Sequence, residues 1–539
     1  MIAVFCVVAV VGVALTGVTL VVRNRTSEVG AVQDVRRVVD KYLSAWEQRD
    51  VVRMQRFVSA PEELASTYVE AFATLSVTRA RFEAGTVTVD GDRADASFAA
   101  RVQLTGLGQW AYRGRLPLER DGSRWLVAWS PAALHPALRP GLRLVQTREL
   151  PPRAAILGVD GSPLSGPGAQ AADVVGMLGA ATAEEAAELG PAYQAGDTIG
   201  RSGLQAAFEH QLAGRPAGAV QVLDESGQVV RTVGRFPGRA PQPVRTTLDP
   251  ATQRSAEQAL ADPSQAAALV AIDAASGEVR AVVSRPTGGF PRALVGRYPP
   301  GSTFKIITTT AALAAGITPD EVVDCPPSLD IDGKVFTNAE DEALGPIPLT
   351  VAFAHSCNTA FINLAGRLSD SQLEAAAANY GFGAGEVELG LPSFGGSFPA
   401  PSGPVEHVAA AIGQARVEVS PLKMAEVAAA VAGGAWRPAR LLADTPPGQA
   451  RALDPTVATS LQQMMGLAVA DGTGRAANLP GSPVHGKTGT AEFGTETPPR
   501  THAWFIGYRD NLAFAVLVED AGFGGEVAAP IAARFLGSL

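Results

Sequence analysis

The chain has 539 residues, of which 46% are hydrophobic and 18% charged, and its formal net charge is −9 at pH 7. This composition is typical of a globular protein with about two to four domains, and it excludes a disordered chain. Because the net charge is negative and no dense run of basic residues occurs, nucleic acid is excluded as a partner.

The first 22 residues, Met1 to Val22, contain no charged side chain. An apolar stretch of about 20 residues crosses a bilayer as one helix, so we predict a single transmembrane anchor over residues 1–23. A cleaved signal peptide is the alternative. It is disfavoured because the apolar run is longer than a usual signal core and has no clear A-x-A cleavage site.

The charged residues beside this segment conflict with the orientation that the motifs below require. Arg23 and Arg25 follow the apolar run and no basic residue precedes it, which taken alone places the bulk of the chain in the cytoplasm. The chemistry of the motifs below requires the opposite orientation. We therefore expect the natural start to lie upstream, with Arg or Lys in the extension.

Residues 28–140 have the pattern of a small α+β domain. An apolar stripe at helical spacing predicts a first helix, formed by Val35, Val38, Val39, Tyr42, Leu43 and Trp46. A second helix is expected over residues 61–75, and strands over 86–89, 94–104, 110–116 and 125–129. No cluster of acidic residues or histidines occurs in this domain, which favours a spacer or docking role.

Two passages rich in Pro and Gly, residues 136–152 and 236–243, separate this domain from the rest. They predict a linker domain over 147–240 and a C-terminal domain over 244–539. In the latter, strands are expected at 268–272, 279–283, 503–508 and 512–518, and Ala-rich helices at 308–315 and 423–432. Helices packed on an antiparallel sheet are the expected architecture.

Only five lysines occur, and two of them lie in short motifs. Ser302-Thr303-Phe304-Lys305 follows Pro299-Pro300-Gly301 and precedes an apolar helix, so we expect Ser302 at a helix N-terminus, where free N–H groups favour negative charge. Lys305 lies one turn later and can reach the Ser302 hydroxyl. Further along are Ser356-Cys357-Asn358 and Lys487-Thr488-Gly489-Thr490.

A second S-x-x-K, Ser420 to Lys423, shows that this pattern alone is weak. Ser420 precedes Pro421 and an apolar run, as a helix N-cap does. We interpret this copy as structural.

The order S-x-x-K, S-x-N, K-T-G resembles that of class B penicillin-binding proteins. Residues 125–136 resemble the end of the cone-shaped, nuclear-transport-factor-like domain of methicillin-resistance-type members. Residues 153–164 and 200–205 resemble the dimerisation domain, and residues 246–253 the entry to the transpeptidase domain. The resemblance implies a multidomain α+β protein whose C-terminal domain has the penicillin-recognising serine transpeptidase fold, an antiparallel sheet with a helical subdomain.

An acyl transfer by a serine needs a neighbouring base, and Lys305 is the candidate. Its neutral form near pH 7 requires a lowered pKa, which desolvation and the charge of Lys487 can supply. The resemblance implies that Ser356 passes a proton to the leaving amine and that Asn358 orients Lys305 and the substrate. It also implies a carboxylate site at Lys487, Thr488 and Thr490, with room left by Gly489, and an oxyanion hole made by the N–H groups of Ser302 and Thr490.

The implied activity is D,D-transpeptidation of peptidoglycan stem peptides ending in D-Ala-D-Ala, with covalent inhibition by β-lactams and without metal or cofactor. The implied partner is a separate membrane glycosyltransferase. Cross-linking occurs outside the cytoplasm, so the bulk of the chain is expected to be extracytoplasmic. Cys325 and Cys357 then lie in an oxidising compartment, and either a disulfide or two free buried thiols is compatible with the sequence.

Other functions remain as alternatives. A D,D-carboxypeptidase shares every acylation residue and differs only in its acceptor. A β-lactam sensor resembles multi-span proteins with a zinc protease, whereas one span is visible here and no histidine belongs to an H-E-x-x-H sequence. A non-catalytic scaffold has no need of all three motifs. A β-lactamase leaves the additional domains unexplained, and a bifunctional class A enzyme requires a glycosyltransferase motif that is not found before Thr246.

Overall fold

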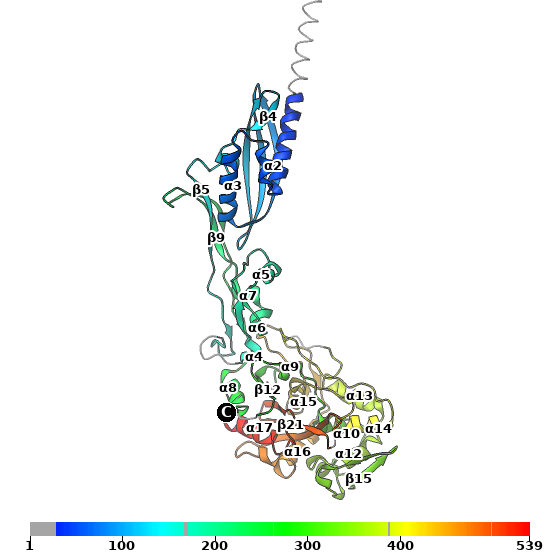
Figure 1. Ribbon diagram of the computed structural model, residues 1–539. Helices are drawn as coiled ribbons and strands as arrows, with labels where there is room; N and C mark the ends of the chain where they lie inside the picture. Colours follow the sequence, from blue (N-terminus) through cyan, green and yellow to red (C-terminus); the bar gives the residue numbers. More distant parts are fainter. Residues whose placement is uncertain (1–28, 166–170, 262–263, 386–388, 497) are drawn as a thin grey trace, which may run out of the picture. The chain divides into compact units, whose positions relative to one another are not determined.

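The computed structural model describes residues 29–165, 171–261, 264–385, 389–496 and 498–539 (Figure 1). The predicted anchor, residues 1–23, lies outside this part of the chain. None of the helices in the described ranges is both long enough and apolar enough to cross a bilayer. The contacts divide the chain into two compact units, one of residues up to 153 with 180–198 and 213–241, the other of 154–179, 199–212 and 242–539.

The first unit contains the predicted α+β domain. A helix over residues 29–47, α2 (Val51–Gln55) and α3 (Pro61–Leu75) accompany an antiparallel sheet of order β1-β2-β3-β4. Its strands are β1 (Val77–Asp90), β2 (Arg93–Leu104), β3 (Gly108–Asp121) and β4 (Arg124–Val127). Both predicted helices are confirmed. Trp46 stacks on Phe82 at 4.1 Å between ring centroids, which anchors the first helix on the sheet.

A second antiparallel sheet in this unit has the order β10-β9-β5. It is formed by β5 (Arg143–Glu149), β9 (Ala217–Leu223) and β10 (Val229–Phe236). Within the predicted linker domain, residues 147–240, strands β9 and β10 belong to the first unit, and residues 154–179 and 199–212 belong to the second.

The second unit is built on an antiparallel sheet of order β13-β12-β22-β21-β20. Its strands are β12 (Ala267–Asp273), β13 (Val279–Arg285), β20 (Val484–Phe493), β21 (Arg500–Arg509) and β22 (Leu512–Val518). In this strand order, β20 lies at one edge of the sheet. The predicted strands at 268–272, 279–283, 503–508 and 512–518 are confirmed.

Both faces of this sheet are covered, which explains why β22 reads as a continuous apolar run. Along β22, Phe514 and Val516 belong to the core shared with α8 (Pro250–Ala259) and α17 (Ala528–Gly537). Ala515 and Leu517 belong to the core on the opposite face, shared with α10 (Lys305–Ala314) and α15 (Pro421–Gly433). This alternation is the period of a strand.

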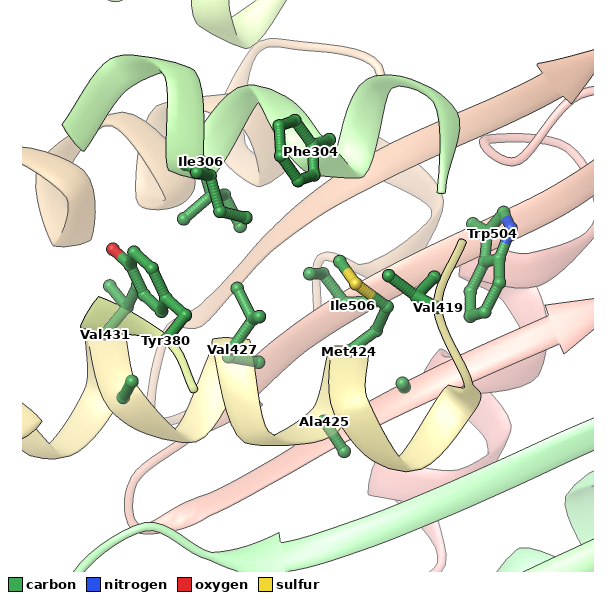
Figure 2. Packing of buried hydrophobic residues seen from close by; sticks show 14 of the residues in the cluster. Phe304, Ile306, Tyr380, Val419, Met424, Ala425, Val427, Val431, Trp504 and Ile506 are labelled. Atoms are coloured by element: carbon green, nitrogen blue, oxygen red, sulfur yellow. The ribbon is translucent and has the colours of Figure 1, made fainter. Parts of the chain in front are cut away.

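The helical part of the second unit packs on that opposite face. Figure 2 shows Phe304 and Ile306 facing Met424 and Val427 of α15, with Ile506 of β21 beside them. Helices α11 (Leu349–Ala354), α12 (Asn358–Ala365), α13 (Asp370–Asn379), α14 (Pro404–Ala411) and α16 (Pro455–Ala470) complete this layer.

Two small hairpins and several short elements accompany these helices. The first hairpin pairs β14 (Val322–Cys325) with β17 (Gly345–Pro348), and the second pairs β15 (Ser328–Ile331) with β16 (Lys334–Thr337). The second unit also contains β6 (Ile156–Leu157), α4 (Ala172–Val175), α6 (Gly203–Ala207), β11 (Val244–Arg245), α9 (Arg292–Val295), β18 (Ala435–Trp436) and β19 (Arg451–Ala452). Helix α5 (Ala183–Leu189) belongs to the first unit, and β7 (Leu178–Ala180), β8 (Thr198–Gly200) and α7 (Glu209–Ala213) have residues in both units.

Candidate active site

Ser302 lies in a 3-10 turn, Gly301–Phe304, which leads directly into α10. The turn begins at Gly301, whose φ is +54° and whose added Cβ would lie 2.8 Å from the carbonyl oxygen of Thr490. Only glycine permits this backbone conformation together with this close approach. The turn therefore brings Ser302 against the edge strand β20, at the start of a helix as predicted.

Lys305 is fully buried at the first position of α10. Its Nζ lies 2.6 Å from the backbone oxygen of Ser356, 2.8 Å from Oδ1 of Asn358 and 3.3 Å from Oγ of Ser356. Burial, and then the charge of Lys487, hold the pKa of Lys305 well below its usual value. The geometry thus unites the first two motifs around one amine.

The S-x-N motif occupies the connection between α11 and α12. Ser356 has a φ of +60°, a strained conformation for a residue with a side chain, and its carbonyl group accepts the hydrogen bond from Lys305. Asn358 begins α12 and donates through Nδ2 to the backbone oxygen of Thr337, 3.0 Å away. This bond ties the end of β16 to the motif.

Cys357, the middle residue of this motif, forms a disulfide with Cys325 of β14. Their Cα atoms lie 6.2 Å apart, within the range of protein disulfides. Of the two states that the sequence left open, the structure has the bridge. It joins the S-x-N turn covalently to the β14–β17 hairpin.

The K-T-G motif lies on β20, which faces the turn of Ser302. Lys487 is fully buried, its Nζ donates to the backbone oxygen of Thr488, and burial lowers its pKa to about 7. A Cβ on Gly489 would lie 2.9 Å from the backbone oxygen of Pro300 and from Cγ2 of Thr303. The glycine therefore allows the edge strand and the serine turn to meet.

A cavity of about 830 Å³ opens beside these residues. Its lining includes Ser302, Asn358 and Thr490 from the three motifs and, from elsewhere, Gln414 and the residues of β16. Lys305 and Lys487 are buried next to it. The arrangement offers a serine hydroxyl, a buried amine of lowered pKa and a strand edge around one space, as acyl transfer requires.

Two contacts of the K-T-G strand had no signal in the sequence. Oγ1 of Thr473, in the segment after α16, lies 2.5 Å from Oγ1 of Thr488. The backbone N–H of Gly524 donates to Oγ1 of Thr490 at 3.3 Å, and the adjacent Phe523 lines the cavity. The Gly-rich segment 521–525 reads in sequence as a simple turn, whereas in the fold it packs on the functional strand.

The second S-x-x-K is a structural element, as predicted. Ser420 is the N-cap of α15, where Oγ accepts from the backbone N–H of Lys423 and donates to the backbone oxygen of Phe394. Lys423 forms a buried ion pair with Glu426. Each polar group thus has a structural partner in the core, and Ser420 is fully buried.

Three family models match the chain. They are the penicillin binding protein transpeptidase domain over residues 267–537, the NTF2-like N-terminal transpeptidase domain over 36–141 and the penicillin-binding protein dimerisation domain over 167–246. Two curated relatives are named peptidoglycan D,D-transpeptidase PbpA. The one from Mycolicibacterium smegmatis is 33% identical over 362 residues, and the one from Mycobacterium tuberculosis 33% identical over 366; each match covers 55% of this chain and 72% of the relative.

Solved structures of penicillin-binding proteins are also similar to this chain. Penicillin-binding protein A from M. tuberculosis, as a ceftriaxone acyl-enzyme complex, superposes with a TM-score of 0.51 at 30% identity, over 56% of this chain and 81% of that one. Penicillin-binding protein 2 from Pseudomonas aeruginosa shares the fold, with a TM-score of 0.62 at 24% identity over 73% of this chain and 96% of that one. The chain therefore belongs to the penicillin-binding protein transpeptidase family, with an NTF2-like N-terminal domain and a dimerisation domain.

Proposed function

We propose that this protein is a peptidoglycan D,D-transpeptidase that works through an acyl-Ser302 intermediate and is inhibited covalently by β-lactams. The observation that carries the proposal is the environment of Lys305, a fully buried amine in contact with Ser356 and Asn358 and one helical turn from Ser302. Burial and a second buried lysine favour the neutral amine, which is the form that acts as a base.

The hydrogen bonds of Lys305 suit a neutral amine. Such an amine has two N–H donors and one lone pair, and the two shortest contacts, to the Ser356 carbonyl and Asn358 Oδ1, use both donors. The lone pair is left for a hydroxyl proton. In acylation, Oγ of Ser302 attacks the carbonyl carbon of the penultimate D-Ala while its proton passes to Nζ of Lys305.

The tetrahedral intermediate collapses when the C–N bond to the terminal D-Ala breaks. Ser356, 3.3 Å from Lys305, relays the proton to the departing nitrogen, so D-Ala leaves with a neutral amino group and Ser302 carries an ester. An acceptor amine then attacks this ester, loses a proton to the same relay and restores the Ser302 hydroxyl. Backbone N–H groups of Ser302 and Thr490 stabilise the oxyanion; losing one such donor typically costs about 3 to 4 kcal/mol.

Lys487, Thr488 and Thr490 hold the terminal carboxylate of the substrate, and Gly489 leaves room for its backbone. The hydrogen bond between the hydroxyl groups of Thr473 and Thr488, and the one that the backbone N–H of Gly524 donates to Thr490, fix the hydroxyl groups of Thr488 and Thr490 in advance. Such preorganisation is what a charge-binding site needs.

The test is turnover of uncross-linked glycan strands bearing D-Ala-D-Ala peptides by the purified full-length chain. Cross-linked peptide dimers and free D-Ala in equal amounts are expected, with loss of both in Ser302→Ala and retention in the matched variant Ser420→Ala. Free D-Ala without dimers would instead identify a D,D-carboxypeptidase. Activity in Ser302→Ala would contradict the assignment of the nucleophile.

We further propose that residues 1–23 anchor the protein in the cell membrane and that the other predicted domains, 28–140, 147–240 and 244–539, face outward, where the precursors are cross-linked. The region before Thr246 matches the NTF2-like and dimerisation domains, which supports the proposal that a separate membrane glycosyltransferase supplies the strands. Crosslinking in native membranes followed by mass spectrometry tests this partnership. Failure to recover a glycosyltransferase would remove it.

A further inference from the structure

Lys334, a third lysine besides Lys305 and Lys487, lies at the active-site cavity. It is the first residue of β16, it is exposed, and it lines the cavity that also contains Ser302. Arginine supplies most of the basic residues of this chain, since only five of the 44 are lysines. Neither the catalytic mechanism nor the core gives Lys334 a role.

The geometry of the hairpin directs Lys334 toward the catalytic end of the cavity. Lys334 and Phe336 share one face of β16, and the Lys334 ammonium lies 5.1 Å from the centre of the Phe336 ring. The next residue, Thr337, receives the hydrogen bond from Asn358. Three residues of strand span about 10 Å, so the ammonium, which extends over Phe336 toward Thr337, lies within about 10 Å of the residue that bonds to the S-x-N motif.

The Lys334 ammonium has no ion-pair partner among the described residues. Asp330 pairs with Val335, on the other face of the hairpin, and its carboxylate accepts from the backbone N–H of Gly333. Asp332 lies in the turn and does not line the cavity. The positive charge is therefore available to a ligand.

Among the residues that the structure describes, the other charged side chains that line the cavity are Glu406 and Glu492. The Glu406 carboxylate already has partners, because it forms an ion pair with Arg416 and accepts a hydrogen bond from the backbone N–H of Ser402. Glu492 is exposed on β20, two residues after Thr490, on a different element from Lys334. Of the three charged residues that line the cavity, Lys334 on the β15–β16 hairpin and Glu492 on the edge strand β20 therefore have no ion-pair partner among the described residues.

Resting on the proposed function, we propose that Lys334 is a specificity-determining residue whose ammonium binds a carboxylate on the acyl-donor part of the substrate. The terminal carboxylate of the leaving D-Ala is assigned to the K-T-G strand, whereas Lys334 is connected through β16 to Asn358, beside the peptide bond under attack. The recognised carboxylate therefore belongs to the second residue before the scissile bond, because the first is the penultimate D-Ala, which has no side-chain carboxylate. A donor peptide that carries a negative charge there is selected over its amide.

A charge series of penicillins tests this contact. Benzylpenicillin has a neutral side chain, carbenicillin adds a carboxylate to the benzylic carbon of that side chain, and ampicillin places an ammonium there. The rate constant for acylation of Ser302 is measured for each with the full-length chain. In Lys334→Gln the ratio of carbenicillin to benzylpenicillin should fall about five-fold, the effect of an exposed ion pair of about 1 kcal/mol.

Matched variants distinguish a direct contact of Lys334 with the carboxylate from a general effect of the charge of the cavity. Lys334→Arg should keep the ratio, and Lys41→Gln, which removes a lysine from the other compact unit, should leave it unchanged. Glu492→Gln raises the charge of the same cavity by one unit and should change the carbenicillin ratio less than Lys334→Gln does. The ampicillin ratio should not fall in Lys334→Gln.

Two kinds of result would contradict the proposed contact of Lys334. An unchanged carbenicillin ratio in Lys334→Gln, or an equal and opposite change in Glu492→Gln, would overturn the contact while leaving the acyl-serine mechanism in place. No acylation of the wild type by any of the three penicillins would overturn the proposed function and this inference with it.

Discussion

Two buried lysines of lowered pKa lie close together in this site, and they have different tasks. Lys305 must be neutral to accept a proton from Ser302, whereas Lys487 must be charged to attract a carboxylate. Burial lowers the pKa of both, and the charge of Lys487 lowers that of Lys305 further. The mechanism requires Lys305 to lose its proton before Lys487 does, and the charge of Lys487 acts in that direction.

This order predicts a bell-shaped pH profile for acylation by benzylpenicillin, measured as kcat/KM. The rate rises with pH as Lys305 becomes neutral, and it falls about tenfold per pH unit well above the pKa of Lys487, near 7, as that amine loses its charge. In Lys487→Arg the alkaline fall should disappear, because arginine stays charged. A wild-type rate that continues to rise to pH 9 would contradict a charged Lys487.

The two S-x-x-K copies predict opposite outcomes from the same substitution. Ser420→Ala removes an N-cap and a buried hydrogen bond, so we expect a loss of about 1 to 2 kcal/mol of stability with unchanged penicillin labelling. Ser302→Ala should abolish labelling with little effect on Tm. Thermal unfolding and labelling of both variants provide the check. Loss of labelling in folded Ser420→Ala would be incompatible with a structural role.

At the scale of elements, the disulfide fixes the S-x-N turn to the β14–β17 hairpin. Cys325 and Cys357 are separated by 32 residues, and closing a loop of that length typically stabilises a domain by about 3 to 4 kcal/mol. We expect the Cys325→Ser, Cys357→Ser double variant to unfold at a lower temperature. The acylation rate should fall as well, because Ser356 and Asn358 flank the bridge.

Thiol counting under denaturing, non-reducing conditions gives the independent control. One reactive thiol, from Cys6, is expected if the anchor is retained and the bridge is formed. Three reactive thiols would rule the bridge out.

Elements with strong local patterns could be predicted from the sequence. The periodic stripe of the first helix, the N-cap of α15 and the continuous apolar run of β22 depend on neighbours in the chain, and the structure confirms them. The start of β1 was missed, although residues 79–84 alternate between polar and apolar, because Ala and Glu are not typical strand residues. The β-propensity of single residues predicts a strand poorly where hydrogen-bonded pairing, here with β2, determines the structure.

The same distinction holds at the site. The motif residues carry their chemistry in their spacing, so their types could be read directly. Thr473, Gly524 and Lys334 reach the site only through tertiary contacts. Nothing in their local sequence distinguishes them from residues of ordinary turns.

At the scale of the whole molecule, the linker region contributes residues to both compact units. Its strands β9 and β10 join the N-terminal unit, while residues 154–179 and 199–212 join the catalytic one. Proline-rich hinges mark where composition changes, but contacts over long sequence distances decide which residues form a unit. Composition alone could not reveal this division.

The anchor predicts a simple difference in fractionation. The full-length protein should sediment with membranes, and a variant without residues 1–23 should not, because the apolar span supplies the attachment. Alkaline phosphatase fused after Leu539 should be active, since it folds only outside the cytoplasm. An inactive fusion that is expressed and stable would reverse the proposed orientation.

The central claim is that Ser302 is the acylated nucleophile. Its most direct test is labelling of the full-length chain with a fluorescent penicillin, followed by peptide mass spectrometry, beside Ser302→Ala. The account predicts a stable adduct on Ser302 and none in the variant. An adduct on another residue, or no adduct on the folded wild-type protein after prolonged labelling, would contradict it.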